Sequence, residues 1–225
     1  MKKAIAIVSG GLDSVTLAYW LKNKGYDLHI LSFNYGQRHK KELEFAIKTA
    51  KTLNAKFDVI DLANLGNLLK GSSLTDDIEV PDGHYAAENM KSTVVPNRNA
   101  IMLAIAYGIA VSENSDVVAT GVHSGDHFIY PDCRPEFIKS FDVMSKLANE
   151  GFGNGNLQVI APFMNMGKHD IVRIGSELGV SYEDTWSCYK GLEKHCGTCG
   201  TCIERQEAFK LTGIKDPTDY EIILS

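Results

Sequence analysis

Short runs of apolar and β-branched residues alternate along the chain with longer segments in which apolar residues recur every three or four positions. The short runs predict strands and the longer segments predict helices. The predicted strands are 4–8, 28–33, 57–62, 116–121 and 157–161. The predicted helices are 14–24, 40–53, 97–112, 135–149 and 167–178. This alternation is typical of a parallel sheet.

The predicted order of elements indicates an α/β fold, a five-stranded parallel sheet with helices on both faces. Gly25 and Gly179 directly follow two predicted helices, where a left-handed residue commonly ends a helix. In such sheets, ligands bind beyond the carboxyl ends of the strands, near the point where the strand order reverses. The turns after the first, second and fourth predicted strands are therefore candidate binding segments.

The composition is that of an ordinary globular protein, 225 residues with 44% apolar and 23% charged residues. The net charge of −5 argues against a stable nucleic-acid partner, because binding to polyphosphates depends on lysine and arginine. The apolar run at 4–8 is shorter than the core of a signal peptide, and the run at 100–111 is too short to cross a bilayer. We expect the second run to be a buried helix, and the protein to be cytoplasmic, with no export signal and no membrane association.

Four of the five cysteines lie close together near the C-terminus, at the spacing C-x7-C-x2-C-x2-C: Cys188, Cys196, Cys199 and Cys202. The interlocking C-x2-C pairs bring three thiolates to one ion, and the first cysteine completes a tetrahedral set. Four thiolates leave no open coordination position, so we predict one structural zinc ion per chain. An iron–sulfur cluster is also held by four cysteines and stays open as an alternative.

The domain organisation follows from these patterns. Residues 65–95 contain turn-forming stretches and few apolar repeats, so we expect an irregular excursion that covers a site or stays mobile. We predict one α/β domain over residues 1–185 that includes this excursion. Residues 186–225 are expected to form a zinc knuckle and a C-terminal helix, packed on the same domain.

The first predicted strand ends in the string SGGLDS, and a helical pattern follows it. Gly10 and Gly11 let a ligand approach the main chain, and the amides of the turn and of the first helical turn form an anion site. Ser9 and Ser14 add hydroxyl groups. The sequence contains neither GxxxxGK[ST] nor a GxGxxG turn after a strand. The alternative is a plain turn capped by Asp13 or Ser14.

SGGLDS resembles the pyrophosphate loop, SGGxDS, of the ATP pyrophosphatases or PP-loop enzymes, which include GMP synthetase and asparagine synthetase. The resemblance implies a fold like that of the adenine nucleotide alpha hydrolases. It also implies cleavage of ATP between the α- and β-phosphates and transfer of AMP to an oxygen of the substrate.

Three further strings carry candidate chemistry. They are FNYGQRHKKE (33–42), VPNRNA (95–100) and TGVHSGDHFIYPDCRPEF (120–137). Arg98 lies near the positive end of a predicted helix, where a buried cation favours an anionic partner, and the alternative is an exposed arginine. In the third string, a carboxylate beside an aromatic ring suits a guanine-like edge that donates hydrogen bonds.

Together the strings resemble those of the 7-cyano-7-deazaguanine (preQ0) synthase family, a branch of the PP-loop class. SGGxDS, YGQRH, VPxRN, TGV, YPDCRxEF and the four-cysteine set occur in the family's order and cover nearly the whole chain. The resemblance implies an ATP-dependent ligase of queuosine biosynthesis. Such a ligase converts 7-carboxy-7-deazaguanine and ammonia into the nitrile through an acyl-adenylate and an amide. The resemblance further implies ATP as a substrate, Mg²⁺, structural zinc and commonly a homodimer.

The resemblance also assigns roles to residues. Catalytic roles are assigned to Asp13, Arg38, His39 and Arg98. ATP contacts are assigned to Val8, Ser9, Gly10, Gly11, Leu12, Asp13, Ser14, Arg98 and Gly121. Contacts to the deazaguanine are assigned to Tyr35, Gln37, Tyr130, Asp132 and Cys133, and the metal ligands are Cys188, Cys196, Cys199 and Cys202. No covalent nucleophile is needed, because the substrate's own oxygen attacks phosphorus.

The chain departs from the family pattern after TGV. Many members carry Glu-Thr-Asp there, whereas this chain has His123, Ser124, Gly125, Asp126 and His127. These residues are expected where substrate or ammonia is handled, so a deazaguanine ligase that stops at the amide is one alternative. A tRNA-modifying adenylating enzyme is another, although the acidic chain has no separate basic domain. A third is a zinc-knuckle interaction protein with a vestigial nucleotide fold, which would not turn over ATP.

Overall fold

Five strands lie side by side in one parallel sheet. The computed structural model describes residues 1–37 and 41–222. The strands are β1 (Lys3–Ile7), β2 (Asp27–Asn34), β3 (Lys56–Asp61), β4 (Val117–Ala119) and β5 (Gln158–Ile160), in the order β3-β2-β1-β4-β5. All neighbouring pairs are parallel. The predicted five-stranded parallel sheet is confirmed, although β4 and β5 have only three residues each.

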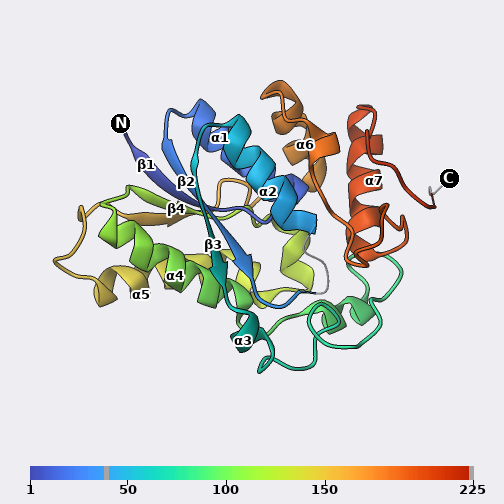
Figure 1. The fold of residues 1–225 in the computed structure, drawn as a ribbon, viewed down its shortest axis with the longest axis horizontal. Coiled ribbons are helices and arrows are strands. Elements are labelled where there is room, and N and C mark those ends of the chain that lie inside the picture. The colour runs from blue at the N-terminus through green and yellow to red at the C-terminus, as the bar shows by residue number, and fades with distance from the viewer. Residues whose placement is uncertain (38–40, 223–225) are drawn as a thin grey trace.

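Helices cover both faces of this sheet (Figure 1). They are α1 (Leu12–Asn23), α2 (Lys41–Thr52), α3 (Ala63–Gly66), α4 (Arg98–Ser112), α5 (Pro135–Ala148), α6 (Lys168–Glu177) and α7 (Gly200–Thr212). Short 3-10 helices are η1 (Glu88–Thr93), η2 (Ser124–Phe128), η3 (Pro131–Cys133) and η4 (Tyr182–Asp184). Helices α1, α2, α6 and α7 pack on one face, and α4 and α5 pack on the other. The five helices predicted from periodicity begin and end within two residues of α1, α2, α4, α5 and α6.

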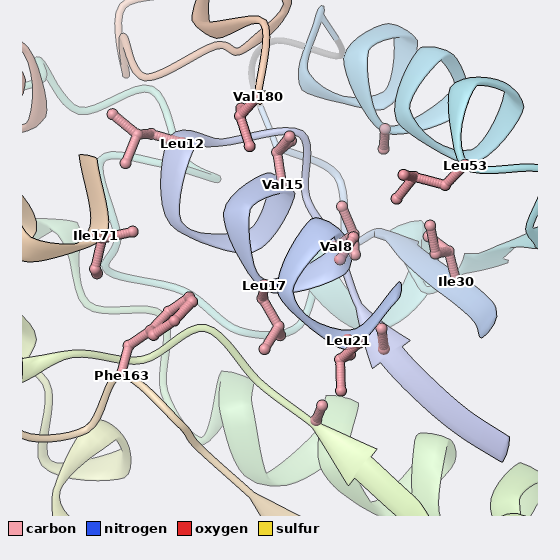
Figure 2. Packing of buried hydrophobic residues seen from close by; sticks show 14 of the residues in the cluster. Val8, Leu12, Val15, Leu17, Leu21, Ile30, Leu53, Phe163, Ile171 and Val180 are labelled. Atoms are coloured by element: carbon pink, nitrogen blue, oxygen red, sulfur yellow. The ribbon is translucent and has the colours of Figure 1, made fainter. Parts of the chain in front are cut away.

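Successive residues of β1 point to opposite faces of the sheet, as the geometry of a strand requires. Ala4 and Ala6 are buried in one apolar cluster with α1, and Ile5 is buried in a second cluster with α4. Figure 2 shows the first cluster, in which Leu17 and Leu21 of α1 are fully buried. Each such leucine contributes about 1.5–3 kcal/mol. Burial on both faces explains why β1 has a continuous apolar run instead of an alternating one.

The apolar run at 100–111 lies within α4. Its Met102, Leu103 and Ala106 are buried against the sheet, as expected for a core helix. Among the residues that the structure describes, no helix combines the length and the apolar character needed to cross a membrane.

The segment between α3 and α4 runs toward the C-terminal part of the chain. It contains η1, and its buried side chains include Leu74 and Met90. Asp82 forms an isolated bridge with Cys199, and Gly83 N donates a hydrogen bond to Thr198 O at 3.0 Å. In Figure 1 this green segment lies below α7. It therefore borders both the sheet domain and the four-cysteine region.

Helix α7 packs against the sheet domain. Phe209 is buried in the same cluster as α1. Arg205 is fully buried and donates hydrogen bonds to Thr185 Oγ1 at 2.7 Å and Tyr182 O at 2.9 Å. Sequence reasoning missed this arginine, because nothing in its local pattern indicates burial. The domain boundary after residue 185 stays a prediction.

The strand order reverses at β1, which lies between β2 and β4. The turn after β1 is therefore at the position where α/β sheets bind ligands. Gly10 in this turn has φ +100°, and a Cβ atom there would lie 2.0 Å from Glu42 O in α2. A Cβ atom at Gly121, after β4, would lie 3.2 Å from Ser14 N. Only glycine lets the segments pack this closely at Gly10.

Replacing Gly10 by alanine is expected to destabilise the protein by more than about 1 kcal/mol. The methyl group would meet the backbone of α2, and φ of +100° is strained for alanine. The free energy of unfolding in urea measures the effect. Gly108→Ala is the matched control, because Gly108 lies in α4 with open space around its Cβ position. The control is expected to be neutral or stabilising, and an equal loss in both variants would contradict this account.

Candidate active site and metal centre

A cavity of about 250 Å³ opens at the carboxyl ends of β1, β2 and β4. It brings together most of the predicted site residues: Val8, Ser9, Gly11, Leu12, Asp13, Ser14, Tyr35, Gln37, Arg98, Gly121, Tyr130 and Cys133. Gly10 and Asp132 are not among its lining residues. Arg38 and His39 lie outside the described residues. The SGGLDS turn and the predicted substrate residues therefore share one space.

Hydrogen bonds fix the SGGLDS turn. Ser14 Oγ accepts a hydrogen bond from Ser9 N at 3.1 Å and donates one to Gly11 O at 3.1 Å. In the described part of the chain, no side chain caps α1, whose N-cap residue is Gly11. The cap by Asp13 or Ser14 that the alternative of a plain turn assumes is therefore not formed. The N–H groups at the positive end of α1 are available to an anion.

Arg98 begins α4 and lines the cavity between two tyrosines. Its guanidinium carbon lies 5.9 Å from the ring centre of Tyr35 and 5.7 Å from that of Tyr130. Burial by itself lowers the pKa of an arginine, but the neighbouring tyrosines and Cys133 outweigh it and raise the pKa of Arg98. The alternative of an exposed arginine is wrong. A charged guanidinium held beside aromatic rings favours an anionic ligand.

Tyr130 and Cys133 form a wall of the cavity. The hydroxyl group of Tyr130 lies 2.6 Å from Thr93 Oγ1 and 3.3 Å from the hydroxyl group of Tyr189, which also lines the cavity. Cys133 Sγ accepts a hydrogen bond from Asn99 Nδ2 at 3.2 Å. Burial raises the pKa of Cys133, so its thiol is neutral at pH 7. Sequence reasoning missed Tyr189, which lies next to a metal ligand and belongs to none of the recognised strings.

Two predicted substrate residues have their polar atoms bonded within the protein. Gln37 Oε1 accepts a hydrogen bond from Tyr35 N at 2.9 Å, and its Nε2 donates one to Phe33 O at 3.1 Å. Asp132 Oδ2 accepts a hydrogen bond from Asn99 N at 2.9 Å and so satisfies a backbone donor at the start of α4. Direct contact of Gln37 and Asp132 with a substrate stays a prediction.

Lys168 connects three elements at the SGGLDS end of the cavity. Its Nζ lies 3.2 Å from Asp13 Oδ2 in α1 and 2.6 Å from Glu204 Oε2 in α7. Burial lowers the pKa of Lys168, but Asp13 and Glu204 outweigh it and raise the pKa, so the lysine is charged. Asp13 Oδ1 is buried and has no hydrogen-bond partner among the described residues. Sequence reasoning missed Lys168 and Glu204, because neither lies in a motif.

His123 and Asp126 lie beside this ion pair. His123 is 1% exposed, and its Nε2 lies 3.7 Å from both Asp13 Oδ2 and Asp126 Oδ2. Glu204 Oε1 is 3.9 Å from the same Nε2 atom. On the other side of the ring, Nδ1 accepts a hydrogen bond from Gly125 N at 3.1 Å. The unusual string after TGV therefore packs directly against Asp13 of the SGGLDS turn.

Glu42, in the first turn of α2, also lines the cavity. Burial raises the pKa of its carboxyl group to about 7, against a smaller opposing effect of Arg98. A carboxyl group with this pKa can exchange a proton near neutral pH. Glu42 belongs to the string FNYGQRHKKE, but the string does not indicate its raised pKa, which results from burial in the folded chain.

The four C-terminal cysteines converge in space. Their Sγ atoms lie within 4.8 Å of one another, and all four residues are buried. Cys196 Sγ accepts hydrogen bonds from Thr198 N at 3.4 Å and Cys199 N at 3.3 Å. Cys188 Sγ accepts one from Cys196 N at 3.4 Å. Donors of this kind stabilise thiolates, so the predicted four-cysteine site is formed and can hold a metal ion.

Replacing Glu42 by glutamine is expected to stabilise the protein at high pH but not at low pH. The pKa of Glu42 is raised from 4.5 to about 7 on folding, so the charged carboxylate opposes folding. This cost begins as the pH rises past the unfolded pKa and is complete above the folded pKa, at about 1.4 kcal/mol per pKa unit. The free energy of unfolding in urea, measured at about pH 5 and about pH 8, tests the prediction.

Glu44→Gln is the matched control, because Glu44 is exposed in the same helix. Its effect on stability is expected to be small, because the side chain is exposed. The same pH dependence in both variants, or none in Glu42→Gln, would contradict the raised pKa of Glu42.

The sequence matches the family described as "Queuosine biosynthesis protein QueC" over residues 3–213. It is also 56% identical, over 97% of the chain, to proteins named 7-cyano-7-deazaguanine synthase from Allorhizobium ampelinum and Brucella ovis. The matched region covers 92% of the first protein and 94% of the second.

Two solved structures share the fold. NMN synthetase from Francisella tularensis has a TM-score of 0.55 at 16% identity, covering 95% of this chain and 78% of that one. The "predicted subunit of tRNA methyltransferase" from Methanocaldococcus jannaschii has a TM-score of 0.50 at 20% identity, covering 96% and 90%. These likenesses concern the fold alone. The match over residues 3–213 and the 56% identity show that the chain belongs to the QueC family of queuosine biosynthesis proteins.

Proposed function

We propose that the protein is an ATP-dependent ligase that converts 7-carboxy-7-deazaguanine and ammonia into 7-cyano-7-deazaguanine (preQ0) in queuosine biosynthesis. The observation that carries the proposal is one cavity that joins the SGGLDS turn to the charged Arg98 and its tyrosine neighbours. Relatives at 56% identity are named for the nitrile product, which supports the nitrile over an enzyme that stops at the amide.

The proposed reaction uses ATP twice. The substrate carboxylate attacks the α-phosphorus of ATP, pyrophosphate leaves, and the acyl-adenylate forms. Ammonia attacks the acyl carbon, loses a proton and displaces AMP to give the amide. The amide oxygen attacks the α-phosphorus of a second ATP, and pyrophosphate leaves. The loss of AMP and both N–H protons then gives the nitrile.

The SGGLDS turn suits the negative charge that develops on the departing pyrophosphate. The N–H groups at the start of α1 and the hydroxyl groups of Ser9 and Ser14 can donate hydrogen bonds to it. Asp13 Oδ1 is buried without a partner among the described residues, so it fits a role as a Mg²⁺ ligand. A bound Mg²⁺ ion would neutralise phosphate charge.

Arg98 suits the binding of the reacting anions. Its place between Tyr35 and Tyr130 fixes the direction of the guanidinium group. A planar cation held in this way can bind the α-phosphate or the substrate carboxylate and keep the reacting atoms aligned. Cys133 is a neutral thiol, and its raised pKa argues against a nucleophilic role. Cys133 and Tyr130 instead supply a wall for the deazaguanine ring.

The four-cysteine site, in this proposal, holds one structural zinc ion. Cys196 Sγ and Cys202 Sγ lie 3.9 Å apart. The edge of a tetrahedron with Zn–S bonds of about 2.3 Å is about 3.8 Å. An iron–sulfur cluster binds its cysteines through different iron atoms, which places the thiolates farther apart. The observed separation therefore supports zinc.

Further parts of the proposal rest on the family resemblance. They are ammonia as the nitrogen donor, a homodimer, catalytic roles for Arg38 and His39, the absence of a stable nucleic-acid partner, and residues 186–225 as an appendage of domain 1–185. A cytoplasmic location belongs to the proposal as well. Its support is that none of the described cysteines forms a disulfide, as in a reducing compartment.

Purified protein incubated with ATP, Mg²⁺, ammonium and 7-carboxy-7-deazaguanine is expected to form the nitrile and release AMP and pyrophosphate. Mass spectrometry identifies the products. Asp13→Asn is expected to lower turnover by about 10²-fold or more, because it removes the carboxylate that would hold Mg²⁺ at the phosphates. Asp27→Asn, at an exposed position in β2, is the matched control and is expected to keep full activity.

Other products would contradict the proposal in different ways. ADP as the nucleotide product would exclude adenylation. An amide that persists in excess ATP would identify an amide-forming ligase. Turnover that requires tRNA, with tRNA binding that weakens steeply with salt, would identify a tRNA-modifying enzyme.

Metal analysis of the purified protein is expected to find about one zinc ion per chain and no visible absorbance. Cys202→Ser is expected to lose the metal and to lower the thermal stability, because Cys202 belongs to α7. Cys133→Ser is the control and is expected to retain the metal, since Cys133 lies outside the four-cysteine set. Stoichiometric iron with visible absorbance would identify an iron–sulfur cluster instead.

A further inference from the structure

We propose that the hydroxyl group of Tyr189 accepts a hydrogen bond from the exocyclic amine of the deazaguanine, which makes Tyr189 a specificity-determining residue. The inference rests on the proposed function, whose substrate carries this amine on its six-membered ring. Tyr189 is half-buried and lines the cavity. Its hydroxyl group lies 3.3 Å from that of Tyr130, which belongs to the wall for the deazaguanine ring.

The two carboxylates of the string TGVHSGDHFIYPDCRPEF have other surroundings. Asp132 Oδ2 accepts a hydrogen bond from Asn99 N at 2.9 Å, and the residue is not among those that line the cavity. Asp126 lines the cavity, but its Oδ2 lies 3.7 Å from His123 Nε2, which is equally close to Asp13 Oδ2. Asp126 therefore lies near the SGGLDS turn, and a different acceptor is needed at the Tyr130 wall.

A chain of hydroxyl groups begins at this wall, and its direction is fixed at one end. Thr93 is fully buried, and its Oγ1 donates its hydrogen to Met90 O at 2.7 Å. The Tyr130 hydroxyl group, 2.6 Å from Thr93 Oγ1, must therefore donate to it. The hydrogen of Tyr130 is then used, so the hydroxyl group of Tyr189 donates to Tyr130. Every hydrogen bond of the chain points from Tyr189 toward Met90 O.

This direction leaves only acceptors for a ligand. A tyrosine hydroxyl group is neutral at pH 7 and has one hydrogen. The hydrogens of Tyr130 and Tyr189 are both used within the chain. The oxygen of Tyr189 keeps its lone pairs, since no donor to it is found in the described part of the chain. A ligand edge that meets Tyr189 must therefore donate a hydrogen bond.

A guanine-like edge meets this requirement. Its ring N–H and its exocyclic amine are adjacent donors, whereas adenine has an acceptor nitrogen beside its amine. If a hydrogen atom replaced the amine, the oxygen of Tyr189 would lose its partner inside the cavity, which costs binding free energy. The amine is remote from the carboxylate that reacts, so a contact there recognises the base without touching the reacting atoms.

The segment before the first of the four cysteines holds Tyr189 in place. Trp186 is 5% exposed, and its N donates a hydrogen bond to Gly10 O of the SGGLDS turn at 3.0 Å. Trp186 Nε1 donates another to Cys188 O at 2.8 Å, and Tyr189 follows directly. The backbone that carries Tyr189 is therefore tied to the SGGLDS turn. A hydroxyl group held in this way cannot easily move to suit a ligand without the amine.

Kinetics with two substrates test the inference. The second substrate is the analogue in which hydrogen replaces the exocyclic amine. The unaltered protein is expected to have a kcat/KM at least about tenfold lower for the analogue. Tyr189→Phe removes only the hydroxyl group. It is expected to lower kcat/KM about three- to tenfold for the deazaguanine and less than about twofold for the analogue, with an unchanged KM for ATP.

Tyr26→Phe is the matched control, because Tyr26 is half-buried and is not among the residues that line the cavity. It is expected to change none of these constants. Equal losses of kcat/KM for both substrates in Tyr189→Phe would mean that the hydroxyl group only supports the wall, and would overturn the inference. A raised KM for ATP with unchanged constants for the deazaguanine would overturn it as well.

Thr93→Val decides the question if Tyr189→Phe fails to fold, which urea unfolding would show. Thr93 is not among the residues that line the cavity, and valine keeps its shape. Without the threonine hydroxyl group, Tyr130 can donate to Tyr189, and the chain can reverse. The preference for the deazaguanine over the analogue is expected to fall at least about threefold, and an unchanged preference would overturn the inference. Absence of turnover of either substrate by the unaltered protein would overturn the proposed function itself.

Discussion

The close contact between the turn after β1 and the start of α2 is the constraint on which the rest of the site depends. Because a Cβ atom at Gly10 would lie 2.0 Å from Glu42 O, the two segments meet backbone to backbone. Gly121 allows a similar approach from β4, at 3.2 Å from Ser14 N. The start of α1 therefore presents main-chain N–H groups that no side chain of the described residues caps, which suits an anion. The same contact brings Glu42 into the cavity wall, where burial raises its pKa to about 7.

The parts of this protein that repeat a regular physical pattern could be predicted from the sequence. Strands buried on both faces appear as apolar runs, and core helices have apolar residues every three or four positions. The sheet was therefore predicted, and five helices were predicted with ends within two residues of those observed. The motifs came together as expected because parallel strands share one carboxyl edge. The strand order and the Lys168–Glu204 ion pair could not be predicted, since both depend on contacts between distant segments. Asp132 belongs to a recognised string, but the string did not indicate its contacts. Its carboxylate accepts a hydrogen bond from Asn99 N, and the residue lies outside the cavity lining.

Charge is distributed unevenly among the residues that line the cavity. Arg98 supplies positive charge among tyrosine rings, where a phosphate or carboxylate gains most from it. Asp13, Asp126 and Glu204 supply carboxylates around His123, and Lys168 pairs with two of them. Arg98 and these carboxylates line the same cavity, so its two ends differ in charge.

The four-cysteine site contributes to this arrangement although it has no position for a substrate. Helix α7 begins directly after Cys199 and contains Cys202, so a metal bound there fixes the start of the helix. Glu204 and Arg205 follow in the same turn of α7, and their side chains contact different parts of the protein. Arg205 is bonded to buried groups of the sheet domain, which fixes the rotation of the helix. Glu204 is thereby held 2.6 Å from Lys168 and, through it, beside Asp13 of the SGGLDS turn. A metal ion held by the four cysteines would therefore help to fix the direction of a carboxylate that lines the cavity.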